Sequence, residues 1–131
     1  MLGNHHAIGE VFQITSDEIL TWNQIFETLA RAACAEMRAV HVPSDFINAF
    51  DAEWGAGLLG DKSHSMIFDN SKIKSTVPGF AATIPYSWGA EEQIAWYDGD
   101  LQRQVVDEKL DHLMDEIIEA YESAWPAGRD E

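Results

Sequence analysis

The C-terminal third of the chain carries the pattern that most restricts the fold, an apolar stripe at helical spacing. Asp100 is a good N-cap for a helix, and Pro126 with Gly128 end the pattern. Between these limits apolar residues recur mostly every three to four positions, which places them on one face of a helix. The residues of this stripe are Leu101, Val105, Leu110, Leu113 or Met114, Ile117, Tyr121 and Trp125.

The charge of the chain limits the kinds of molecule that it is expected to bind. Residues 98–131 contain 11 acidic and 3 basic side chains, and the whole chain has a net charge of −15. On an amphipathic helix such acids are typical of a solvated face, so we prefer this interpretation to an acidic docking helix. Nucleic acids and anionic membrane surfaces both require a basic face, so neither is an expected partner.

Length and composition predict one globular unit spanning residues 1–131. A chain of 131 residues with 46% hydrophobic residues can bury a core without disulfides. The single cysteine, Cys34, excludes a disulfide framework, and we expect a small buried residue there. The N-terminus lacks the basic and apolar regions of a signal peptide, so the predicted compartment is the cytoplasm.

Helices are predicted in four further places. Thr15 and Glu18 match a capping box, followed by apolar residues at helical spacing, which predicts a helix over about Ser16–Glu36. Ser44 or Asp45 can cap a helix that runs to Trp54 and is broken by glycines. A short helical turn over 71–75, a loop over 77–85 and a helix over 87–97 complete the prediction.

Three short runs favour extended structure. Residues 10–15 and 39–42 are rich in β-branched and aromatic residues, and residues 65–68 resemble them. The predicted fold class is therefore α+β, mostly helical with a few short strands.

Gly55, Gly57 and Gly60 match the G-x-G-x-x-G fingerprint of dinucleotide-binding proteins. That motif works only between a buried strand and a helix, with an acidic residue about 20 positions further on. Here it follows a helix-like segment, and residues 70–90 contain no Asp or Glu. We therefore interpret the glycines as part of a loop.

Other patterns also have a chemical and a structural interpretation. Ser71 and Lys74 fit S-x-x-K, the arrangement of some serine hydrolases, but the companion motifs are missing. His112 and Glu116 share a helical face and could bind a metal weakly, although a surface pair is the preferred interpretation. His5 and His6 lie near a terminus and are not interpreted as metal ligands. These residues alone indicate no active site.

Several strings, in their shared order, resemble the C-terminal part of the NAD-dependent epimerase/dehydratase family, the extended short-chain dehydrogenases/reductases. The resemblance covers roughly residues 2–121. The matching strings are Ala7-Ile-Gly9-Glu10, Phe12-Gln-Ile-Thr15, Leu20-Thr-Trp22, Val42-Pro43, Leu59-Gly60-Asp61-Lys62, Phe68-Asp-Asn-Ser-Lys72, Val77-Pro78, and Gly89 followed by Trp96-Tyr97.

This resemblance implies the substrate-binding lobe of an oxidoreductase whose Rossmann domain lies outside the chain. In the family, the N-terminal Rossmann domain binds NAD or NADP and carries a Tyr-x-x-x-Lys pair, and the C-terminal part closes over the substrate. No Tyr-x-x-x-Lys occurs here. The chain would hold no cofactor and would not be competent alone. The expected partners are a small-molecule substrate and the missing Rossmann domain. Whether the chain also forms a homo-oligomer stays open.

Within this chain the resemblance implies substrate contacts at Asp61, Lys62 and His64. Nucleotide-sugar enzymes of the family often have Arg-x-Gly-Asp, whereas this sequence has Leu58 in place of the arginine. A bidentate contact to diphosphate is therefore lost, although Lys62 can supply a point charge. Asn70 and Lys72 are expected to cap and pin the short helix that they begin. The alternative function is a stand-alone acidic interaction module without enzymatic activity.

Overall fold

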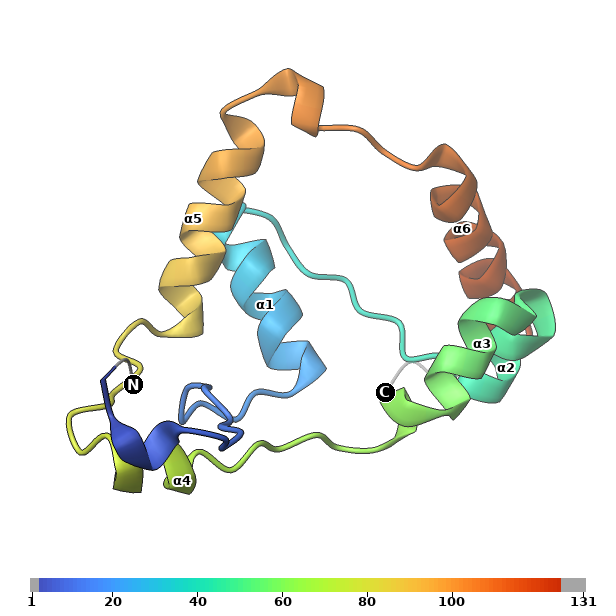
Figure 1. Cartoon of the computed structure of the whole chain (residues 1–131). Coiled ribbons are helices and arrows are strands. Elements are labelled where there is room, and N and C mark those ends of the chain that lie inside the picture. Colours follow the sequence, from blue (N-terminus) through green and yellow to red (C-terminus); the bar gives the residue numbers. More distant parts are fainter. Residues whose placement is uncertain (1–2, 126–131) are drawn as a thin grey trace. The chain divides into compact units, whose positions relative to one another are not determined.

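The computed structural model describes residues 3–125, which form helices and irregular segments without a strand (Figure 1). These residues group into two compact units. The first unit contains residues up to Met37 together with Met66–Gly99, and the second contains Arg38–Ser65 and the residues from Asp100 onward. The helices are η1 (His5–Ala7), α1 (Trp22–Ala32), α2 (Ser44–Phe50), α3 (Ala52–Leu59), η2 (Asp61–Ser63), α4 (Ser71–Thr76), α5 (Tyr86–Asp98), η3 (Leu101–Arg103) and α6 (Glu108–Ser123).

The mostly helical prediction is confirmed, but the predicted strands are wrong. Residues 10–15, 39–42 and 65–68 are irregular in the described structure. A strand needs a neighbour to complete its hydrogen bonds, and β-propensity without such a neighbour does not create one. The short helix α4, the loop over 77–85 and helix α5 agree with their predictions.

Helix α1 begins later than predicted because a second capping box lies closer to its apolar residues. The backbone N–H of Gln24 donates to Thr21 Oγ1 at 3.2 Å, and the backbone N–H of Thr21 donates to Gln24 Oε1 at 2.8 Å. Thr15 is therefore not the N-cap. Glu18, the expected N3 residue, instead accepts from the Tyr86 amide at 2.7 Å, where α5 begins. α1 packs against α5 in the first unit.

The predicted helix before the glycines is divided at Asp51. This residue is extended, with φ −137°, and its carboxylate accepts from the Trp54 amide at 2.8 Å as the N-cap of α3. Gly55 and Gly57 lie inside α3, so the loop predicted there is wrong. Gly55 is buried, and a Cβ at this position would overlap Asn48 of α2. The missing side chain lets α2 and α3 pack closely.

The C-terminal stripe is also interrupted. Asp100 caps only the short η3, and Asp107 starts α6 by accepting from the Lys109 and Leu110 amides, both at 3.1 Å. Val105 and Val106 are β-branched and exposed between the two helices. Ile117 is buried, and Tyr121 meets Phe46 of α2 edge to face at 5.4 Å between ring centroids. The predicted stop at Pro126 and Gly128 lies outside the described residues.

Cys34 is exposed, so the expected buried thiol is wrong. It follows the end of α1 with φ +53°, a left-handed conformation that turns the chain away from the helix. The helix ends before Cys34, which therefore never reaches the apolar face of α1.

Candidate functional site

The three expected substrate-binding residues lie on one exposed turn of the second unit. Asp61 and Lys62 form η2 directly after α3, and the His64 amide closes this turn by donating to the Asp61 carbonyl at 3.3 Å. All three residues are exposed. The three residues are neighbours in the sequence, and the turn keeps them close in space. Their role as substrate contacts stays a prediction.

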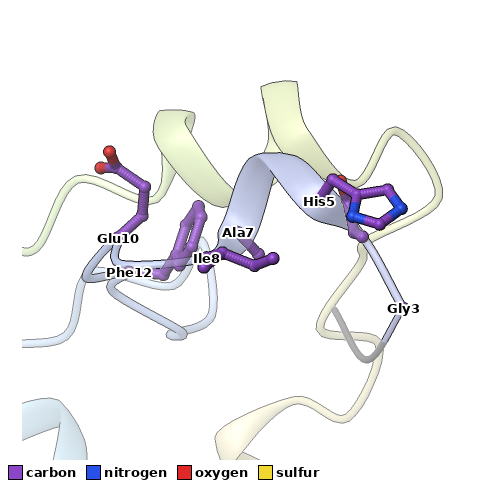
Figure 2. A pocket seen from close by; sticks show the side chains of 7 residues that line it. Gly3, His5, Ala7, Ile8, Glu10 and Phe12 are labelled. Carbon is purple, nitrogen blue, oxygen red and sulfur yellow. The ribbon is translucent and has the colours of Figure 1, made fainter.

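A shallow hollow lies in the first unit, on the N-terminal segment (Figure 2). Its volume is about 560 Å³. Figure 2 shows that η1 and the residues on either side of it form the hollow. The residues that line it are Gly3, Asn4, His5, Ala7, Ile8, Glu10 and Phe12.

Helix α4 holds the walls of this hollow in place. Lys72 Nζ lies 2.6 Å from Glu10 Oε2 and 5.1 Å from the centre of the Phe12 ring. At the other end of α4, the Thr76 carbonyl accepts from Asn4 Nδ2 at 3.0 Å. Glu10 is therefore already paired with a cation, and the rest of the lining is mainly apolar.

A second set of contacts ties the same segment to the start of α4. Asn70, only 8% exposed, donates from Nδ2 to the Thr15 carbonyl at 3.1 Å and to Asp17 Oδ1 at 2.8 Å. Lys74 Nζ donates to the two carboxylate oxygens of Asp17 at 2.6 and 2.8 Å. The expected pinning by Asn70 and Lys72 is confirmed. The Asn70 side chain does not cap α4, whose Ser71 amide donates to Asp69 at 2.8 Å instead.

These contacts lower the pKa of three carboxyl groups. The hydrogen bond from Lys72, reinforced by its charge, lowers the pKa of Glu10. Hydrogen bonds from Lys74 and then Asn70 lower the pKa of Asp17. Hydrogen bonding from Ser71 lowers the pKa of Asp69. All three groups remain anions at neutral pH. Glu10 and Asp17 tie the N-terminal segment to lysines of α4, and Asp69 holds the first residue of α4.

The S-x-x-K pattern does not assemble a hydrolase site. Its lysine must be a free amine to activate the serine, but the Lys74 ammonium is bound by the Asp17 carboxylate. Ser71 is the first residue of α4, and its amide is held by Asp69. The observed contacts favour the structural interpretation of both residues.

The glycine pattern does not fit a dinucleotide. Its first two glycines lie within α3 and its third is the C-cap, so the motif closes a helix where a phosphate site would open one. Gly55 faces Asn48, which leaves no approach for a pyrophosphate.

His112 and Glu116 form the expected surface pair. His112 Nε2 lies 3.6 Å from Glu116 Oε1, and both side chains are more than half exposed. Within residues 3–125, no group of three or more His, Cys, Asp or Glu side chains is placed to hold a metal ion. None of the helices in that range is both long and apolar enough to cross a membrane.

Sequence reasoning missed the roles of Asp17 and Glu10, which bind lysines 57 and 62 positions away. Neither separation has a local periodicity, so only a contact map or an alignment could have identified these pairs. Comparisons of the chain with family models, with curated proteins and with solved structures find no match.

Proposed function

We propose that this chain is the substrate-binding portion of an NAD(P)-dependent epimerase/dehydratase-like oxidoreductase and is not catalytically competent alone. The observation that carries the proposal is the amount of large apolar surface left exposed. Among residues 3–125 the buried hydrophobic residues are Ile73, Ala90 and Ile117. A protein of this composition ordinarily buries far more, so another domain is expected to cover what remains.

The exposed residues include side chains that are rarely left in water together. Trp22, Phe26, Trp88 and Trp96 of the first unit each expose more than half of their surface. The lobe interpretation predicts such a surface where a Rossmann domain packs. An independent acidic module predicts a closed surface, which fits these residues poorly.

In this function, the η2 turn contacts a small polar substrate. Lys62 supplies a positive charge, and Asp61 and His64 supply hydrogen-bonding groups beside it. Leu58 stands where a diphosphate-binding arginine would be, so we favour a substrate with a single anionic or hydroxyl-rich group. The Rossmann domain would hold NAD or NADP and carry out hydride transfer.

The mass of the native protein tests this function most directly. We expect an antibody against this chain to detect, in the source cells, a band at more than twice 14.7 kDa. A band at 14.7 kDa would support the acidic interaction module, for which the exposed acids of α6 are the best candidate surface.

Substrate contact can then be tested in that longer protein. We expect Lys62→Met to raise KM for an NAD(P)-linked substrate about 10-fold. Lys109→Met, which removes an exposed lysine on α6, is the matched control and leaves KM unchanged. Equal kinetics for the two variants would remove Lys62 from the site.

A further inference from the structure

The apolar stripe of α6 is covered along only part of its length. In the C-terminal half, Ile117 is buried and Tyr121 meets Phe46 of α2. In the N-terminal half, Leu110 is 44% exposed and Met114 is 38% exposed. Both lie on the same side of the helix as Ile117. Leu110 and Met114 therefore form an open face of α6 that the described part of its own unit leaves uncovered.

A row of acidic side chains runs along one edge of this open face. Its members are exposed and follow one another at spacings of three or four residues, so they share one side of the helix: Glu108, Asp111, Asp115, Glu119 and Glu122. Asp111 lies one turn before Met114, which places the row beside the apolar side chains. Within residues 3–125, none of the five acids forms an ion pair.

The acidic row works against the stability of α6 itself. Like charges at these spacings repel one another along a helix. Glu122 also lies in the last turn, where the helix dipole favours a cation, and that turn contains no basic residue. No cation of the described chain offsets this repulsion, whereas a cationic partner would relieve it. The charges of the row are therefore complementary to a basic surface.

The combination of charge and apolar surface restricts what can cover the open face. Free cations would neutralise the acids but leave Leu110 and Met114 in water. Nucleic acids and anionic membranes carry the same sign of charge as the row. A second copy brings the same acids and a net charge of −15. A helix with apolar side chains on one face and Lys or Arg beside them satisfies both requirements.

We propose that the open face of α6 binds a basic amphipathic helix of a partner protein. Leu110 and Met114 pack against the apolar side chains of that helix, and Asp111 and Asp115 pair with its lysines or arginines. The sequence favours a purely solvated role for these acids, but the uncovered apolar residues beside them favour docking. The proposal stands apart from the proposed function, because it uses neither the η2 turn nor a Rossmann domain.

Charge removal from the acidic row tests the proposal first. The probe is a fluorescent helical peptide of leucine and lysine whose leucines lie on one face, and its anisotropy gives the Kd. We expect Asp111→Asn combined with Asp115→Asn to raise the Kd about 10-fold. Glu91→Gln combined with Glu92→Gln removes the same charge from exposed positions of α5 and is the matched control. The control should change the Kd less than about 2-fold.

The apolar part of the open face is tested in the same assay. We expect Leu110→Gln combined with Met114→Gln to raise the Kd about 10-fold, since the leucines of the peptide lose their contacts. Met66→Gln combined with Ile67→Gln is the matched control, because these side chains of the first unit are even more exposed. Circular dichroism checks that every variant keeps the helix content of the unmodified chain.

Three results would overturn the proposal. The first is an unchanged Kd in either α6 variant. The second is equally tight binding of a peptide with the same composition but its leucines spread around the helix, because charge attraction alone would then explain the binding. The third is self-association of the chain that Leu110→Gln with Met114→Gln abolishes, which would identify a second copy as the occupant.

Discussion

Cys34 shows how a single residue ends a helix in an unfavourable conformation. The Ala35 amide donates to the Ala30 carbonyl at 2.8 Å, and the Cys34 amide donates to the Arg31 carbonyl at 3.1 Å. These are the two hydrogen bonds of a Schellman motif, whose left-handed position is usually glycine. A cysteine there has a Cβ that crowds the backbone.

Cys34→Gly should therefore stabilise the first unit by about 1 kcal/mol, because glycine adopts a positive φ without strain. Thermal unfolding followed by circular dichroism measures the change. Ala33→Gly is the matched control, since Ala33 has φ −80° and gains no relief from glycine. A control variant as stable as Cys34→Gly would show that the cap is not strained.

Gly55 and Gly57 make a second residue-scale test, this time in α3. Gly55→Ala should destabilise the second unit by about 1–3 kcal/mol, because its Cβ would overlap Asn48. Gly57→Ala meets nothing within 4 Å and should stabilise the helix by about 0.5–1 kcal/mol. Chemical denaturation of both variants measures the two changes in stability. Changes of the same sign would contradict the close packing of α2 and α3.

At the scale of elements, α1 was predicted to follow a capping box at Thr15 and Glu18 but begins at one formed by Thr21 and Gln24. We expect Thr21→Ala to cost about 1 kcal/mol of stability, because the Gln24 amide loses its acceptor. Thr15→Ala is the control: it keeps the backbone carbonyl that Asn70 uses and should change stability little. Urea denaturation measures the stability of both variants. A larger loss of stability for Thr15→Ala than for Thr21→Ala would support the predicted start of α1.

The ties between the N-terminal segment and α4 should make the first unit sensitive to acid. Because Glu10 and Asp17 have lowered pKa values in the folded chain, their stabilisation is complete above the ordinary carboxyl pKa. It is lost as the pH falls through the lowered values, which places the transition below about pH 4.

Asp17→Asn tests this pH dependence. The variant should unfold at a lower temperature than the unmodified chain at pH 7, and the difference should disappear in acid, where Asp17 is protonated as well. Glu91→Gln removes an exposed acid of α5 for which no ion pair is observed, and it is the control. A difference for Asp17→Asn that persists at low pH would show that the ion pair is not its source.

At the scale of the whole molecule, the exposed aromatic residues predict strong binding of a dye that fluoresces on apolar surfaces. We expect Trp22→Gln combined with Trp88→Gln to weaken this fluorescence, because both rings are largely exposed. Fluorescence titration of the 131-residue chain measures it, with Glu91→Gln again unchanged. An absence of dye binding would favour a closed, independent module.

The sequence predicted only part of the candidate site, because residues that contact one another there lie far apart along the chain. Asn70 and Lys72 were expected to pin α4 because they lie at its start. Their partners Asp17 and Glu10 lie more than 50 residues away, and no spacing rule connects them. The η2 turn was identified by resemblance, and its exposure could be learned only from the structure.

The sequence by itself determined most of the helical segments, since the apolar spacing of α1 and α6 and the Asp and Thr caps act within a few residues. Tertiary structure decided what those local signals could not: that Glu18 binds the first residue of α5 and completes no cap at Thr15, that Gly55 of α3 serves packing against Asn48, and that 11–14 and 66–68 have no ladder. Helical hydrogen bonds are local and need only the segment itself. A strand depends on a neighbour, so strand-type residues remain irregular until one is supplied.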